Sequence, residues 1–184
     1  MRFEIPDHKI LVHELVLPIY WGEMDELGHV NNTVYFKYME QARVSWIASQ
    51  SGQVSSEEEG PVIANTFCNF YRPLVFPGQV VARLYVAHPG RTSIDTFVTL
   101  ERQDDPGQAY AAGGATLVWV SRTDGRPLPL PGFLRALEGS LPALPGGESH
   151  PALPGKRSAA PLRHRHANFF RQLTGFLPLT RCTL

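Results

Sequence analysis

The chain has 184 residues, of which 43% are hydrophobic and 18% charged, a composition that suits one globular domain with some length left over. Its 17 basic and 17 acidic residues cancel, so the overall charge gives no indication of a nucleic-acid partner. The charge is unevenly distributed, however: from Pro145 onward six basic residues stand against one acidic residue, which predicts a mildly acidic body followed by a basic tail.

The first predicted elements are a strand and a long helix. Residues 10–22 are rich in aliphatic and aromatic side chains, as expected of a strand. Over residues 32–48 apolar residues recur at helical spacing and form one stripe. The stripe consists of Tyr35, Met39, Ala42 and Trp46. Asn31 or Asn32 can cap this helix through its side-chain oxygen, and Gly52 is expected to end it.

Four β-like runs follow, over residues 61–72, 79–88, 92–102 and 108–122. In the third run, side chains alternate with the period of a strand that has one covered face. Pro-Gly turns separate the runs, which predicts a meander. Because a wide apolar stripe on a single helix must be covered, the order of elements predicts an α+β fold in which one curved antiparallel sheet wraps around the helix.

The sequence predicts three segments along the chain. A domain is expected over residues 1–139, with a short helix at 133–138 near its end. Residues 140–163 are dense in Pro, Gly and Ala, which predicts a disordered linker. Residues 164–184 form a basic, aromatic tail to which we assign no role.

The two cysteines, Cys68 and Cys182, have no metal or disulfide spacing and suit a reducing, cytoplasmic setting. His164 and His166 with Cys182 are a weak metal signal, so no metal site is predicted. We recognise no signal peptide, and no apolar run approaches the roughly 20 residues of a membrane span. No integral membrane segment and no nucleic-acid partner are therefore expected.

Chemistry is expected where the first strand gives way to the helix. A helix N-terminus presents free N–H groups and a partial positive charge, which can polarise a carbonyl group and stabilise an oxyanion. Asp25 stands seven residues before Asn32, and Gly28 between them allows the backbone to fold back. A carboxylate held there could attack the carbonyl or deprotonate a water molecule. On spacing alone, however, a capped loop explains Asp25, His29 and the Asn pair more simply.

The longer segment WGEMDELGHVNNTVYFKYMEQAR, residues 21–43, contains an Asp–x–x–Gly–His–Val–Asn–Asn core. It closely resembles the first strand-to-helix segment of hotdog-fold acyl-CoA thioesterases of the 4-hydroxybenzoyl-CoA thioesterase family, in the branch that includes the bacterial long-chain acyl-CoA thioesterases. The later segments NFYRPLVFPGQVVARLYV, GRTSIDTFVTL and GGATLVWVSRTDGRPLPLP also match. The resemblance covers about residues 10–138 and implies a hotdog fold, a five-stranded antiparallel sheet around one central helix.

The resemblance implies roles for individual residues. Asp25 would be the catalytic carboxylate, acting as base or nucleophile on the thioester, and the backbone N–H near Asn32 would donate to the thioester oxygen. The residues implied to line the acyl end of the pocket are Gly28, His29, Asn31 and Tyr35. A homodimer, often doubled to a tetramer, is also implied, because in this family the pocket lies between two subunits whose sheets join. No cofactor is implied beyond the coenzyme A thioester that is the substrate.

The chain departs from the family pattern at two positions. Tyr20 stands where Arg is frequent, and Glu23 stands where Asp is frequent. Neither replaces Asp25, although both could alter how the loop is held. Glu23 and Glu26 are expected to be solvated neighbours of Asp25.

A second carboxylate, Glu40, lies eight residues after Asn32, about 12 Å along the helix axis. Another branch of the fold places its catalytic carboxylate on this helix, so Glu40 could be that group or could support Asp25 at the substrate. An ion pair with Arg43 or Lys37 is the simpler role.

Coenzyme A carries phosphates, which call for basic side chains or free N–H groups. Arg72, Arg91 and Ser93 stand at predicted strand ends and are the candidates for these contacts.

Two alternatives to a thioesterase stay open. A non-catalytic acyl-CoA-binding module would keep the fold without turnover. A hotdog enoyl-CoA hydratase matches less well, because those enzymes use an Asp–x–Asn–Pro–x–His loop, whereas here no Asn-Pro pair lies between Asp25 and His29. The aromatic residues suit a fatty or an aromatic acyl group equally, and they suit a plain core as well.

Overall fold

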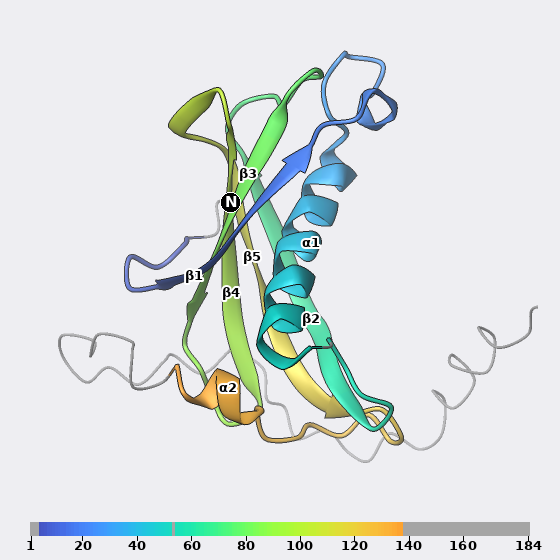
Figure 1. Ribbon diagram of the computed structural model, residues 1–184, viewed down its shortest axis with the longest axis vertical. Helices are drawn as coiled ribbons and strands as arrows, with labels where there is room; N and C mark the ends of the chain where they lie inside the picture. Colours follow the sequence, from blue (N-terminus) through green and yellow to red (C-terminus); the bar gives the residue numbers. More distant parts are fainter. Residues whose placement is uncertain (1–3, 53, 138–184) are drawn as a thin grey trace, which may run out of the picture. The chain divides into compact units, whose positions relative to one another are not determined.

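The computed structural model describes residues 4–52 and 54–137 (Figure 1). The elements in chain order are β1 (Ile10–Pro18), the short 3-10 helix η1 (Trp21–Glu23), α1 (Asn32–Ser51), β2 (Glu59–Phe70), β3 (Gln79–Ala87), β4 (Ser93–Arg102), β5 (Asp105–Ser121) and α2 (Gly132–Arg135). The domain boundary predicted at residue 139, the linker 140–163 and the tail 164–184 lie outside the described residues and stay predictions.

The five strands form one antiparallel sheet in the order β1-β3-β4-β5-β2. Helix α1 runs along one face of this curved sheet, called the inner face below, and begins at the end of the sheet where β1 finishes (Figure 1). The predicted α+β architecture, a hotdog fold with one long central helix, is therefore confirmed.

The expected meander of four strands is wrong for β2, which pairs with β5 and not with β3. The reason lies in the connection between β2 and β3, which is not a tight turn. Its Leu74 O accepts from Val30 N at 2.9 Å, and Tyr71 N donates to Tyr110 O at 2.9 Å. These bonds carry residues 71–78 across the end of the sheet beside the start of α1, so β2 runs along the outer side of β5.

Helix α1 begins at Asn32 as predicted and extends to Ser51, beyond the predicted end at residue 48. Asn31 is the N-cap, because its side chain accepts from Thr33 N. Gly52 adopts the left-handed conformation (φ 75°) and its N–H donates to Ala48 O, which ends the helix as predicted. The whole predicted apolar stripe is buried against the sheet, and each large side chain in it contributes roughly 1.5–3 kcal/mol through burial.

The alternation predicted for the third β run is confirmed, and the residues on its inner face are fully buried: Ile94, Thr96, Val98 and Leu100. The opposite face is also partly covered, which the sequence did not predict. Phe97 packs edge-to-face with Phe67 at a centroid distance of 6.5 Å. Glu101 is held by Arg83 Nη1 at 2.6 Å and by Gly107 N at 2.8 Å.

Helix α2 lies at the end of the sheet away from the start of α1 (Figure 1). It is shorter than the predicted helix 133–138. Phe133 packs edge-to-face against Trp46 and Trp119, at centroid distances of 6.4 and 6.5 Å, and Leu134 is completely buried. This cluster closes the far end of the core. Neither described helix is long and apolar enough to span a membrane.

Helix α1 approaches β5 closely at Gly113. A Cβ atom at this position would collide with the carbonyl oxygen of Phe67 on the neighbouring strand and would lie 3.0 Å from the Sδ and Cε atoms of Met39 on the helix. At Gly114 a Cβ would lie 2.8 Å from the ring of Phe97. Gly113 therefore sets how near the helix lies to the sheet, while Gly114 leaves room for Phe97 on the opposite face.

We predict that Gly113→Ala destabilises the protein by about 1–3 kcal/mol, because a methyl group there must displace a strand carbonyl as well as Met39. Gly132→Ala is the matched control, since no atom lies within 4 Å of a Cβ at that position. Its effect should stay within about 0.5 kcal/mol. Urea denaturation of both variants checks this, and equal midpoints for Gly113→Ala and the wild type would contradict it.

Candidate active site

The loop between β1 and α1 forms a small hairpin. Met24 and Val30 make an isolated antiparallel bridge, and within the loop Asp25 N donates to His29 O at 2.7 Å. Gly28 has φ 75° and its N–H donates to Asp25 O at 3.0 Å. Gly28 thus makes the fold-back that was predicted for it, and Asp25 lies at the base of the hairpin.

The two oxygens of the Asp25 carboxylate have different environments. Oδ1 accepts from Leu27 N at 2.9 Å and from His29 N at 3.3 Å. Oδ2 has no hydrogen-bond partner within the described residues, and the side chain is partly exposed. One oxygen is therefore used to orient the group, while the other is free to act on a bound molecule.

The start of α1 leaves one amide free. Asn31 Oδ1 accepts from Thr33 N at 3.0 Å, and Asn31 O accepts from Val34 N at 2.9 Å. Asn31 N itself donates to Glu23 O at 2.9 Å. In the part of the chain that the structure describes, Asn32 N is therefore the first-turn amide that finds no acceptor, which is the position predicted for the donor to a carbonyl oxygen.

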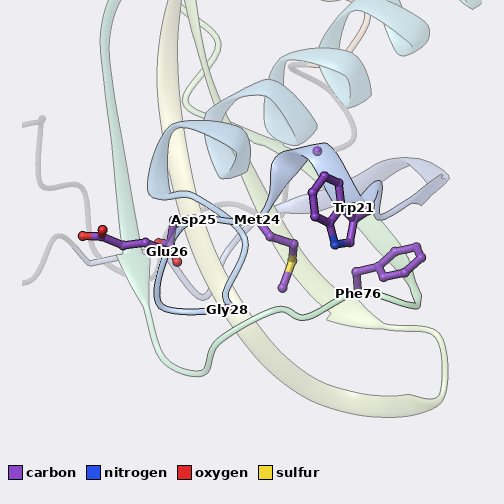
Figure 2. Close-up of a pocket in the computed structure, with 7 residues that line it drawn as sticks. Trp21, Met24, Asp25, Glu26, Gly28 and Phe76 are labelled. Atoms are coloured by element: carbon purple, nitrogen blue, oxygen red, sulfur yellow. The ribbon is translucent and has the colours of Figure 1, made fainter.

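A pocket of about 620 Å³ opens beside this hairpin (Figure 2). Its lining residues are Trp21, Gly22, Met24, Asp25, Glu26, Gly28 and Phe76. The rings of Trp21 and Phe76 lie on one side of it, while the Glu26 side chain extends away from them (Figure 2). Of the predicted site residues only Asp25 and Gly28 line the pocket. The apolar wall was missed for two reasons. Trp21 was assigned to the end of the first strand, and Phe76 comes from the β2–β3 loop, whose path the sequence did not reveal.

Three predicted pocket residues lie beside the pocket rather than in its wall. His29 is exposed, and Asn31 is used as the helix cap. Tyr35 is buried and its hydroxyl accepts from Leu74 N at 2.9 Å. Burial raises the pKa of Tyr35, the Leu74 N–H opposes this, and the charges of Cys68 and Asp25 add to the rise. In this structure Tyr35 supports the loop 71–78.

Within the described residues Glu40 makes neither of the two ion pairs expected as alternatives, with Arg43 or with Lys37. Glu40 is exposed, and no ion pair within residues 4–52 and 54–137 involves it. Lys37 instead binds Glu23, with Nζ 2.8 Å from Oε1. Arg43 is only 7% exposed, and its Nη1 has no hydrogen-bond partner. Burial lowers the pKa of Arg43, and the charge of Glu40 offsets this in part.

Glu23 is not the solvated neighbour of Asp25 that was expected. Its side chain is 10% exposed and accepts from three donors, which are Lys37 Nζ, Tyr38 Oη and Tyr20 N. Burial by itself would raise the pKa of Glu23, but these three hydrogen bonds and the charge of Lys37 outweigh it, so the pKa lies below its usual value. The contacts therefore stabilise the fold at neutral pH, and this stabilisation is lost as the pH falls through the lowered pKa. Glu26 is exposed, as expected.

The three predicted coenzyme A contacts do not lie together within one chain. Arg72 is at the same end of the sheet as the hairpin, where its Nη1 is 3.3 Å from Asp105 Oδ2 and its guanidinium stands 5.9 Å from the ring centroid of Tyr110. Arg91 and Ser93 are at the opposite end, where β4 begins. Only Arg72 can therefore serve the pocket of its own chain.

Neither Cys68 nor a metal cluster offers an alternative reactive centre in the described part of the chain. Burial raises the pKa of the Cys68 thiol to about 12, so this thiol is protonated at neutral pH and is not a nucleophile. No group of three or more His, Cys, Asp or Glu side chains is placed to hold a metal ion among these residues.

We predict that Tyr35→Phe lowers the unfolding free energy by about 1–3 kcal/mol, because it leaves the buried Leu74 N–H without an acceptor. Tyr71→Phe removes a hydroxyl from an exposed side chain nearby and is the control. Chemical denaturation of the two variants measures the difference, and equal losses would contradict the role given to the Tyr35 hydroxyl.

Comparison with known proteins agrees with this geometry. Residues 19–137 match the model of the Thioesterase-like superfamily. A proposed thioesterase from Pseudomonas aeruginosa is 37% identical, with 70% of this chain and 99% of that chain covered and a TM-score of 0.68. A proposed acyl-CoA thioesterase from Xanthomonas campestris is 32% identical, with 64% and 99% covered and a TM-score of 0.59.

A third similar structure carries a ligand. A thioesterase from Thermus thermophilus, solved in complex with coenzyme A and zinc, is 27% identical, with 67% of this chain and 94% of that chain covered and a TM-score of 0.54. The family match covers well over half of the chain and includes the hairpin, the central helix and strands β2 to β5, while β1 precedes it. The chain therefore belongs to the Thioesterase-like superfamily.

Proposed function

We propose that the protein hydrolyses the thioester bond of a fatty or aromatic acyl-CoA to a free acid and coenzyme A. The observation that carries this proposal is the presence of two free groups on segments that one hydrogen bond joins. Asp25 Oδ2 and Asn32 N both lack partners within the described residues, and the hydrogen bond from Asn31 N to Glu23 O joins the segments that bear them.

The Asn32 N–H, at the positive end of α1, would donate to the thioester carbonyl oxygen and stabilise the negative charge that develops on it. Asp25 Oδ2 would either accept a proton from a water molecule that attacks the carbonyl carbon, or attack that carbon itself to form an anhydride that water then opens. In both routes the C–S bond breaks and the thiolate takes up a proton. The reaction consumes one water molecule and needs no cofactor or metal.

The pocket supports an acyl-CoA as substrate. Trp21, Met24 and Phe76 supply an apolar wall next to the carboxylate, which suits an acyl group of either class. Arg72, exposed at the same end of the sheet, would contact a phosphate of coenzyme A. The coenzyme A in the Thermus thermophilus relative supports this choice of thiol. We place the reaction in the cytoplasm, as the cysteine content suggests.

We predict that Asp25→Asn lowers kcat for acyl-CoA hydrolysis by at least about 100-fold, because the amide can neither take up a proton nor attack the carbonyl group. The assay measures release of the free thiol from a panel of octanoyl-, palmitoyl-, benzoyl- and 4-hydroxybenzoyl-CoA. Asp124→Asn is the control, since Asp124 is an exposed acid in the loop after β5 and should leave kcat unchanged.

The same assay, extended to Glu40→Gln and to an enoyl-CoA, separates the alternatives. Full activity in Asp25→Asn together with a loss in Glu40→Gln would move the catalytic carboxylate to the helix. Tight binding of acyl-CoA with intact ligand recovered from the wild type would indicate a binding module. Loss of enoyl absorbance with an enoyl-CoA would indicate a hydratase.

We also propose that β2 pairs with β2 of a second copy to form a homodimer, which could double to a tetramer. Strand β2 is an edge of the sheet, and its central residues 62–66 are exposed on both faces. Val44 on α1 and Phe70 at the end of β2 are exposed as well. An exposed edge strand is suited to pair with a second copy of the same chain, and the side chains of Val44 and Phe70 add exposed apolar surface.

We predict that Ile63→Lys shifts the protein toward a monomer, because it places a charge on the edge strand proposed to lie in the interface. Val16→Lys is the matched control: Val16 is 44% exposed on β1, the other edge strand, and Ile63 is 46% exposed on β2. Light scattering after size-exclusion chromatography measures the mass. A monomeric wild type at micromolar concentration would contradict the proposed dimer.

A further inference from the structure

We infer that Glu23 is a positioning residue for the proposed hydrolysis: it holds the hairpin that bears Asp25 in register with the start of α1. This inference rests on the proposed function of Asp25. It concerns the contacts that the side chain of Glu23 makes with Lys37 and Tyr38.

The side chain of Glu23 joins the loop to the second turn of α1. Its Oε1 lies 2.8 Å from Lys37 Nζ, and its Oε2 accepts from Tyr38 Oη at 2.6 Å. The same Oε2 accepts from Tyr20 N at 3.0 Å, which closes the turn of η1. Bonds between charged partners are shorter and stronger than neutral ones, and Tyr38 is buried in the core. The carboxylate thus ties the loop to a fixed part of the helix.

The backbone of Glu23 makes the second attachment. Glu23 O accepts from Asn31 N at 2.9 Å, and Asn31 is the neighbour of Asn32, whose amide is the proposed donor. Asp25 follows Glu23 by two residues. A single hydrogen bond would let the hairpin turn about the bond axis. Two attachments, one at the N-cap and one on the second turn of α1, fix its orientation. Glu23 therefore determines where Asp25 Oδ2 lies relative to Asn32 N.

Glu23 is not itself placed to act on a substrate. Both of its oxygens have partners and the side chain is 10% exposed, and it is absent from the pocket lining. Asp25, in contrast, lines the pocket with one oxygen free. Glu23 and Asp25 thus have different tasks, the first positional and the second reactive.

Glu23→Gln keeps the size of the side chain but removes the charge, and its amide NH₂ cannot accept from Lys37 or Tyr38. We expect kcat to fall by about 10- to 100-fold, because a shift of about 1 Å in a reacting group costs up to about that much. KM should stay within about threefold, since Glu23 does not contact the pocket. Tyr38→Phe loses one hydroxyl and should lower kcat in the same direction by a smaller factor.

The decisive measurement is the double variant Asp25→Asn/Glu23→Gln. If Glu23 acts only through Asp25, the double variant is as slow as Asp25→Asn alone, because residues that act as a unit are not additive. If the two fold-losses multiply, or if Glu23→Gln and Tyr38→Phe both keep the kcat of the wild type, the inference is overturned. Full activity in Asp25→Asn would instead overturn the proposed function, and the inference with it.

Glu101→Gln separates positioning from a general loss of stability. Glu101 is a carboxylate of matching burial, 12% exposed, with a short bond to Arg83 and a backbone donor, but it lies on the outer face of β4. It should lose thermal stability to an extent similar to Glu23→Gln and keep the kcat of the wild type. An equal fall of kcat in both variants would overturn the inference, because loss of a buried ion pair would then suffice to explain the effect.

Discussion

The hydrogen bond from Asn31 N to Glu23 O, at 2.9 Å, is the contact on which the arrangement of the site depends. It joins the end of η1 to the residue before α1, so the hairpin and the helix share one fixed point. The cap formed by the Asn31 side chain then uses the Thr33 N–H. What remains is an amide at Asn32 that points out of the first turn at the positive end of a 20-residue helix.

The start of the helix and the β2–β3 loop support each other. Tyr35 is one turn into α1, and its hydroxyl accepts from Leu74 N, while Leu74 O accepts from Val30 N. The N–H of Leu74 therefore finds its partner on α1, and the carbonyl oxygen of Leu74 finds its partner on the hairpin. In turn Arg102, at the end of β4, donates to Val75 O at 2.7 Å and to Pro77 O at 3.2 Å. The loop that carries Phe76 into the pocket is therefore held from both sides.

Contacts close in the chain were predictable from the sequence. The apolar stripe of α1 follows from spacing alone, because a helix repeats every 3.6 residues whatever it packs against. The cap and the roles of Gly28 and Asn32 depend on residues within one loop, and the resemblance to a known family added Asp25. The stripe, the cap and the turn at Gly28 lie where the sequence placed them, while the roles of Asp25 and Asn32 in catalysis belong to the proposed function.

Contacts far apart in the chain were not predictable. Glu23 meets Lys37 and Tyr38 across 14 and 15 residues, and that meeting depends on the path by which the loop after β1 folds back against the second turn of α1. No local pattern records this path, so Glu23 was assigned to solvent. The partner of β2 was missed for a related reason, since pairing with β5 is set by the path of residues 71–78.

The glycine at position 113 has a consequence for how a substrate could enter. Met39 rests against the backbone of β5 with no side chain of that strand between them, so the spacing between this part of α1 and β5 is set by the backbone of the strand. Room for a bound molecule therefore cannot come from moving α1 toward β5. Under the proposed function, the size of the acyl group is set instead by the pocket wall, to which Trp21 and Phe76 contribute.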